Sequence, residues 1–213
     1  MSSSAPKVPE AGAGEWVSLS DDLLAGLVHG LNNRVTALSV FAELIALGDS
    51  QMASSGMLAT EVGRLQRLST LLAMLPARTQ GAEALEMDPV LDDAISLHAQ
   101  HPRMHPMECV VERSGELPPL RAARWALLRL FLLVVHAAKG AAEAARRERV
   151  IIHLAGDADS VTLRVFALGG GVYAAALAEQ CGGAIVQVGD ELQLALPSLT
   201  AVRRREHIAR AAD

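Results

Sequence analysis

The chain has 213 residues, enough for one large or two small domains that each bury a hydrophobic core. Hydrophobic residues make up 51% of the sequence but aromatic residues only 3%, which favours helices packed through leucine and alanine. The formal net charge is −5, from 19 basic and 24 acidic residues. This balance argues against the broad basic surface that DNA binding needs, so we expect no nucleic-acid partner.

Cysteine usage and the chain ends indicate the compartment. Cys109 and Cys181 stand in unrelated contexts, which predicts neither a disulfide framework nor a zinc site. Residues 1–17 are mostly small and polar and lack the basic-then-apolar order of a secretory signal, so we expect them to be disordered. The apolar run at residues 125–138 is shorter than the roughly 20 residues of a membrane span, and an arginine interrupts it. The sequence therefore predicts a cytoplasmic protein with no membrane partner.

The first periodic stretch predicts one long helix. Ser20, followed by Asp21 and Asp22, provides the hydroxyl cap and the acidic first turn that favour a helix start. Apolar residues then recur at alternating spacings of four and three residues, which is typical of a coiled-coil seam. The seam residues are Leu24, Val28, Leu31, Val35, Leu38, Ala42 and Ile45. Gly48 and Asp49 are expected to end this helix.

A second periodic stretch, from about Met52 to Leu75, predicts another helix, which Pro76 closes. Two helices joined by a short polar turn form an antiparallel hairpin, and the apolar stripe here is too long for one hairpin to bury. Pairing two hairpins into a four-helix bundle buries the stripe. We therefore expect a homodimer that associates through a hairpin covering residues 18–78.

After a polar linker at residues 79–86, helices and strands alternate up to residue 199. The expected elements are helix 90–97, strand 108–112, helix 122–142, strands 150–154 and 161–167, helix 173–180, and strands 184–188 and 191–196. Gly189 and Asp190 form a strong hairpin-turn signal between the last two strands. The pattern predicts an α+β fold with an antiparallel sheet, followed at residues 200–213 by a basic, solvated tail.

His29 is the candidate for chemistry. It lies one position from the seam residue Val28, so it is expected to point to solvent. A neutral imidazole nitrogen is a competent nucleophile for phosphoryl transfer near pH 7, and its N–P bond is labile enough to pass the group to a carboxylate. Asn33, one turn later, could orient a water or a carbonyl beside the ring. A lone helical histidine is more often a plain surface residue, so its neighbours decide the interpretation.

The run from Leu27 to Leu38 resembles the H-box of histidine kinases, in which an acidic residue and then Asn or Thr follow the phospho-acceptor, ahead of Pro-Leu-Thr. The matching residues are His29, Leu31, Asn33 and Thr36. The resemblance extends over residues 21–197. It implies a dimeric four-helix bundle formed by hairpin 18–78, followed at residues 87–199 by a reduced α/β sandwich of the histidine-kinase, Bergerat-like type.

The ATP-binding motifs of that family are degenerate here. His136 occupies the place of the N-box asparagine that binds the nucleotide's magnesium, and an imidazole does not supply the hard oxygen ligand. The family's Asp-x-Gly-x-Gly lines up with Ala167, Gly169 and Gly171, so the carboxylate that binds adenine is absent. Only nine residues separate the last of these glycines from the next glycine motif, so the lid is missing as well. We expect no cofactor and no metal.

Two more departures lie beside the phospho-acceptor. Gly30 replaces the acidic residue that serves as general base in autophosphorylation, and Arg34 replaces a proline. The resemblance therefore implies a histidine phosphotransferase that relays a phosphoryl group between response-regulator receiver domains without using ATP. In this interpretation His29 accepts the phosphoryl group. Asn33 and Arg34 flank that group, and Arg34 stabilises its negative charge.

Two other functions stay open at this stage. One is an atypical, sensor-less histidine kinase that binds ATP in an unorthodox pocket, and the other is a non-enzymatic dimeric adaptor that binds a response regulator. A metal site formed by His98, His101, His105 and Cys109 is disfavoured because two prolines break any common helical face. The glycine triplet at residues 169–171 is more often a plain turn than a phosphate cradle.

Overall fold

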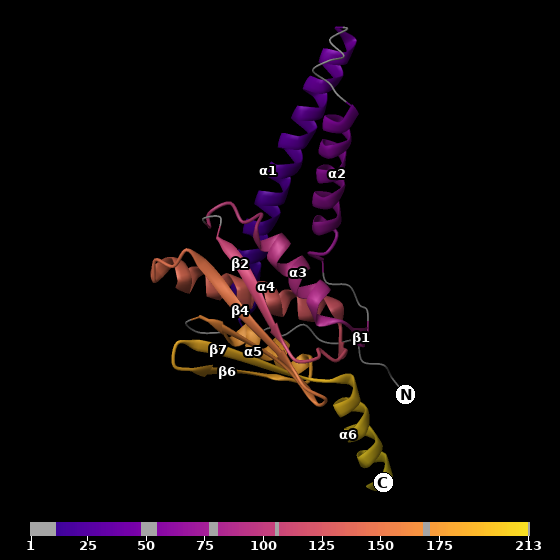
Figure 1. Cartoon of the computed structure of the whole chain (residues 1–213), viewed down its shortest axis with the longest axis vertical. Helices are drawn as coiled ribbons and strands as arrows, with labels where there is room; N and C mark the ends of the chain where they lie inside the picture. The colour runs from indigo at the N-terminus through magenta and orange to yellow at the C-terminus, as the bar shows by residue number, and fades with distance from the viewer. Residues whose placement is uncertain (1–11, 48–54, 77–80, 105–106, 168–170, 213) are drawn as a thin grey trace.

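The computed structural model describes residues 12–47, 55–76, 81–104, 107–167 and 171–212. Its elements in chain order are α1 (Ala13–Ala46), α2 (Ser55–Leu72), β1 (Glu83–Leu85), α3 (Met87–His98), β2 (Glu108–Ser114), β3 (Leu120–Ala122), α4 (Arg124–Ala144), β4 (Arg149–Gly156), β5 (Ser160–Phe166), α5 (Val172–Gln180), β6 (Ala184–Val188), β7 (Glu191–Pro197) and α6 (Leu199–Ala212). Helices α1 and α2 project as a stalk from an α/β body (Figure 1). The α+β class and the N-terminal hairpin are thus confirmed, while Gly48 and Asp49 lie outside the described residues.

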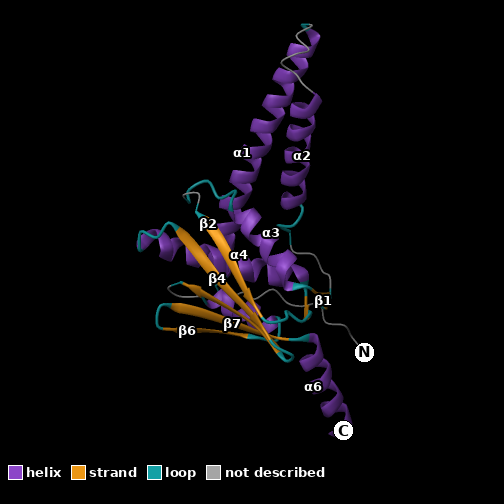
Figure 2. Cartoon of the chain, in the orientation of Figure 1, coloured by secondary structure: helices purple, strands orange, loops and turns teal. Residues whose placement is uncertain are grey.

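The body contains a five-stranded sheet in the order β2-β4-β5-β7-β6, with helices packed on one face (Figure 2). Strands β4, β5, β7 and β6 pair antiparallel, but β2 pairs parallel with β4. The predicted antiparallel sheet is therefore wrong at this edge. Helix α4 lies between β2 and β4 in the chain, and a helical crossover returns the chain in the same direction.

Helix α4 is the centre of the core. Buried side chains cover its whole circumference, because it packs against the sheet, α3 and α5 at once. Strands β4, β5 and β7 alternate buried and accessible residues, so one face of the sheet meets this helix and the other is open. Among the described residues α4 is the one helix long and apolar enough to cross a membrane, and 83% of its most apolar stretch is buried in the body. The apolar run at residues 125–138 is thus a core helix, as predicted.

The first helix begins earlier than the sequence predicts. Helix α1 starts at Ala13 after Gly12, and Ser20 lies within it, donating its hydroxyl to the carbonyl of Val17. The disorder predicted for residues 1–17 is therefore wrong from residue 12 onward. Trp16 explains the difference: only 8% of it is exposed, because it packs on the guanidinium of Arg129 in α4.

The side of α1 that packs on the body is not the predicted seam. The buried residues are Trp16, Leu19, Leu23 and Leu27, whereas the seam residues Leu24, Val28, Val35 and Ile45 are 43–53% exposed. Leu23 and Leu27 each precede a seam residue, Leu24 and Val28, by one position, which is about 100° around a helix. The stripe is therefore apolar and open in the single chain.

Two segments outside the predicted elements are ordered. The linker at residues 79–86 contains β1, which pairs antiparallel with β3, a strand that the pattern did not predict. Residues 200–212 of the predicted solvated tail lie in helix α6, and residues 203–211 are exposed, as predicted. Ala201 is buried at the base of this helix and Arg204 Nη1 lies 2.9 Å from Asp159 Oδ1, so contacts with the body order a segment for which composition predicted no helix.

Candidate functional site

His29 is exposed on α1, as predicted, and it pairs with Asn33 one turn later. The His29 Nε2 and Asn33 Nδ2 atoms are 3.0 Å apart. An amide nitrogen only donates, so in this arrangement Nε2 accepts the hydrogen bond and carries the lone pair, while the ring proton resides on Nδ1. Asn33 thus orients the imidazole and favours the tautomer in which Nε2 is the nucleophile.

Helix geometry separates three faces of α1. Leu23 and Leu27 face the body, and the stripe that contains Val28 is open. His29 lies about 100° from Val28 and within about 40° of Asp22 and Asn33, because successive residues turn by 100°. The histidine therefore shares a polar face that neither the core nor the apolar stripe occupies.

Two glycines bracket His29 and allow the body to approach α1. A Cβ on Gly26 would lie 1.7 Å from the Gln100 carbonyl oxygen, and one on Gly30 would lie 3.3 Å from Leu68 Cδ1 of α2. The backbone after α3 therefore touches α1 directly at Gly26. Sequence reasoning interpreted Gly30 only as a missing acid, but the Gly-x-x-x-Gly spacing already signals close packing of this kind.

Arg34 does not lie beside His29, where the sequence predicted it. Its Nη1 lies 3.0 Å from Glu61 Oε2 in α2, and Arg64 Nη1 lies 2.6 Å from the other oxygen of the same carboxylate. The hydrogen bond from Arg34 is the main reason that the pKa of Glu61 lies below its usual value. Five residues turn a helix by about 140°, so Arg34 faces α2 while His29 faces solvent. The predicted flanking role of Arg34 is therefore corrected to an interhelical ion pair.

His136 belongs to a histidine cluster that the sequence did not predict. Its Nδ1 lies 3.2 Å from His98 Nε2, and the three rings of His98, His101 and His136 have centroids 5.4–5.5 Å apart. Burial lowers the pKa of His98 to about 3 and also lowers the pKa values of His101 and His136. His101 Nε2 lies 3.4 Å from Asp22 Oδ2, which links the cluster to α1.

Of the four residues whose metal site the sequence disfavours, His98 and His101 stack on each other with ring centroids 5.5 Å apart. His105 lies outside the described residues, and burial raises the pKa of the half-buried Cys109 thiol, which disfavours the thiolate that a metal binds. Within the described ranges no group of three or more His, Cys, Asp or Glu side chains is arranged to hold a metal ion.

Of the positions that align with the adenine motif, Gly171 lies where α1 packs on α5. Ala167 is fully buried, Gly169 is outside the described residues, and Gly171 precedes α5 with a φ of +68°. A Cβ on Gly171 would lie 2.3 Å from a carboxylate oxygen of Glu15. The first turns of α1 thus pack directly on the start of α5.

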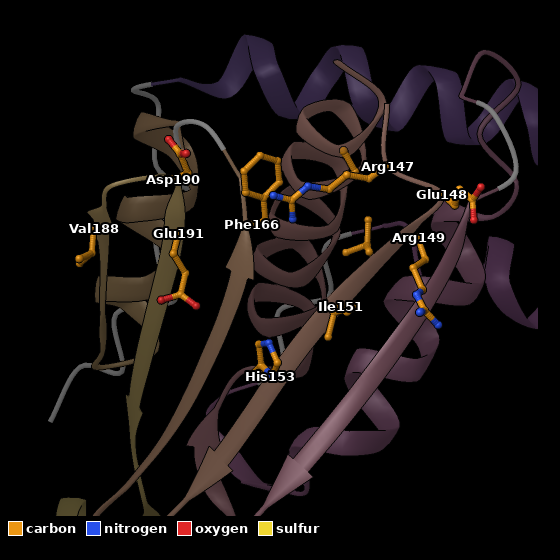
Figure 3. A pocket seen from close by; sticks show the side chains of 11 residues that line it. Arg147, Glu148, Arg149, Ile151, His153, Phe166, Val188, Asp190 and Glu191 are labelled. Atoms are coloured by element: carbon orange, nitrogen blue, oxygen red, sulfur yellow. The ribbon is translucent and has the colours of Figure 1, made fainter. Parts of the chain in front are cut away.

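A cavity of about 590 Å³ opens on the sheet beside Arg147 and Phe166, and none of the described residues that line it is a predicted site residue (Figure 3). The guanidinium of Arg147 stacks 3.5 Å from the centroid of the Phe166 ring. Arg149 lines the cavity together with Asp190 and Glu191, so both signs of charge are present. The lining favours no single class of ligand.

No family model matches the chain, and no curated protein matches it. Among solved structures it is similar to a bacterial phosphotransferase, with 14% identity over 90% of this chain and 99% of that chain and a TM-score of 0.41. It is similar to the Acinetobacter baumannii histidine kinase AdeS, with 15% identity over 80% and 98% and a TM-score of 0.41. It is also similar to the histidine kinase ThkA, solved in complex with the response regulator TrrA, with 14% identity over 87% and 64% and a TM-score of 0.44. The proposals below rest on the residues of this chain.

Proposed function

We propose that the chain is a cytoplasmic histidine phosphotransfer protein that relays a phosphoryl group between response-regulator receiver domains through His29. The observation that carries the proposal is the exposed imidazole on a free polar face of α1, with Asn33 holding the lone pair on Nε2. A partner can reach this atom without moving any element of the body.

In the proposed reaction the exposed Asn33 amide releases its hydrogen bond to His29 Nε2, and the freed lone pair attacks the phosphorus of a receiver's aspartyl phosphate. The N–P bond forms as the P–O bond to the aspartyl carboxylate breaks, and the carboxylate leaves with the electron pair. The ring then loses its Nδ1 proton to solvent. A second receiver reverses these steps, and each receiver supplies its own magnesium, so this chain needs no cofactor.

The apolar stripe of α1 supports a homodimer. Leu24, Val28, Val35 and Ile45 lie on α1 at heptad spacing and are exposed, and Met57 and Val62 are exposed on α2. A second hairpin packed on this stripe would complete a four-helix bundle and remove the apolar surface from water. His29 would stay accessible because it faces about 100° away from Val28.

The degenerate nucleotide positions support transfer without ATP. His136 is engaged with His98, and Gly171 is covered by Glu15 of α1. At the N-box position the side chains of His136 and His98 offer only ring nitrogens and no hard oxygen ligand for magnesium. We therefore propose that the α/β body acts as a scaffold and docking surface.

The test uses each receiver domain of the source organism, phosphorylated with acetyl phosphate and incubated with the purified chain. We expect acid-labile, base-stable label on the wild type and no label on His29→Gln. His153→Gln is the matched control, because His153 is accessible on the open face of the sheet and should keep the label. Label that persists on His29→Gln, or an adaptor function that this variant retains, contradicts the proposal.

A further inference from the structure

Three carboxylates at the base of the stalk are each shared by two basic side chains. The clusters are Arg34–Glu61–Arg64, Arg67–Asp93–Arg124 and Arg103–Asp22–His101. Each joins separate elements: the first joins α1 to α2, the second joins α2 to α3 and α4, and the third joins α1 to the turn after α3. Asp93 and Asp22 thus anchor the stalk to the body, and Glu61 anchors the two stalk helices to each other.

The anchors are covered while most of the arginines are open. The side chains of Glu61, Asp93 and Asp22 are 11%, 13% and 19% exposed, respectively. The side chains of Arg64, Arg67 and Arg103 are 57%, 52% and 72% exposed, respectively. A partner therefore meets guanidinium groups, although the whole chain carries a net charge of −5. Asp21 is an exposed acidic side chain on the same part of α1 and offsets one of these charges.

The three open arginines bracket His29 along the stalk. Asp22, which holds Arg103, precedes His29 by seven residues and so lies on the same face about 10 Å away. Gly30 packs on Leu68 of α2, which places the neighbouring Arg67 at the level of His29. Arg64 precedes Arg67 by about one turn of α2, and it pairs with Glu61, which also pairs with Arg34.

We propose that Arg64, Arg67 and Arg103 form a docking rim for the acidic face of a receiver domain, an inference that rests on the function proposed above. A receiver's phosphorylation site needs carboxylates to bind magnesium, so the face that must approach His29 is negative. Guanidinium groups already fixed by buried carboxylates lose little side-chain entropy on docking, and their charge accelerates encounter with an acidic partner.

Sharing of the anchors makes single substitutions safe to test. Arg64→Gln leaves Arg34 on Glu61, Arg67→Gln leaves Arg124 on Asp93, and Arg103→Gln leaves His101 beside Asp22. Glu61 and Asp93 each keep an arginine, whereas Asp22, whose side chain is 19% exposed, keeps only His101, whose pKa is lowered by burial. Circular dichroism and thermal unfolding verify the fold of each variant. The matched controls are Arg121→Gln and Arg204→Gln, which remove exposed arginines from ion pairs with Glu206 and Asp159 beside α6.

The measurement is the initial rate of phosphoryl transfer from a labelling receiver domain at low and high salt. We expect each rim variant to slow transfer about three- to tenfold at 50 mM salt, and this difference to shrink at 500 mM salt because exposed charges are then screened. Both controls should match the wild type. The docking rim is overturned if the rim variants transfer at the wild-type rate at both salt concentrations, or if the control variants slow transfer as much as the rim variants do.

Phosphoramidate separates this outcome from failure of the proposed function, because it phosphorylates accessible histidines without docking. If phosphoramidate labels the wild-type chain at His29 but the rim variants transfer at the wild-type rate, the proposed phosphotransfer function stands and the docking rim is rejected. Wild-type chain that neither phosphoramidate nor any receiver labels at His29 overturns both.

Discussion

At the scale of single residues, His29 and the buried histidines have opposite environments. His29 is exposed, and a single exposed hydrogen bond, from the Asn33 amide, must break to free its Nε2 for chemistry. His98 is 1% exposed, and its Nδ1 has no hydrogen-bond partner among the described residues. Burial disfavours the protonated ring, which is why the pKa of His98 is depressed. Histidine is therefore a candidate nucleophile at position 29 on α1, whereas at position 98 it is a buried side chain that packs in the body.

The depressed pKa values of His98, His101 and His136 predict acid-sensitive stability. Unfolded histidines bind protons with a pKa near 6.5, whereas these three bind protons only at lower pH when folded. Their contribution to the free energy of unfolding is therefore fully present above pH 6.5 and decreases as the pH falls below that value. For His98 the decrease continues down to its folded pKa of about 3.

Urea unfolding at pH 7.0 and 5.0 checks this prediction, because most carboxylates stay ionised in that window. We expect a lower free energy of unfolding at pH 5.0. The double variant His98→Leu/His136→Leu should depend less on pH, and the same dependence in this variant and in the wild type would contradict the assignment to the cluster.

At the scale of elements, α1 is held by contacts on both sides of the histidine. Asp22 binds Arg103 and lies beside His101, Gly26 touches the carbonyl of Gln100, and further along the helix Arg34 reaches Glu61 in α2. The hydrogen bond from Arg103 is the first reason that the pKa of Asp22 lies below its usual value. The turn that carries His29 is thereby fixed to the body, which keeps the position of the exposed imidazole constant for an incoming partner.

Gly26→Ala tests this contact. A methyl group there would overlap the Gln100 carbonyl, so α1 must shift, and we expect a loss of about 1–3 kcal/mol in the free energy of unfolding. Gly63→Ala in α2 is the matched control, because open space surrounds it and alanine favours a helix by about 1 kcal/mol. Denaturant titration measures both changes. Equal effects of the two substitutions would show that the Gly26 contact does not restrain α1.

At the scale of the whole molecule, the open apolar stripe predicts self-association. Val35 on the stripe and Val186 on the exposed edge strand β6 are both 53% exposed, so they form a matched pair of sites. We expect the wild type to sediment as a dimer, Val35→Lys to shift toward the monomer, and Val186→Lys to remain dimeric. Analytical ultracentrifugation at micromolar concentration measures this, and a monomeric wild type would contradict the four-helix bundle.

The sequence alone determined the elements whose signal is local. Heptad spacing predicted the hairpin, alternation predicted β4, β5, β6 and β7, and the motif around His29 predicted an exposed histidine with Asn33 beside it. These features follow from the periods of helices and strands, which any stretch of sequence displays by itself. The start of α1, by contrast, depends on Trp16 meeting Arg129, more than a hundred residues away in the chain.

Only the tertiary structure decided which neighbours the polar residues have. In the structure Arg34 pairs with Glu61 and does not flank His29, and His136 lies against His98 and His101. Strand β2 pairs parallel with β4, and residues 200–212 lie in α6. Each of these outcomes depends on a contact between segments distant in sequence. Periodicity shows which side of an element is apolar, but it does not show which polar side chain another element will bring to it.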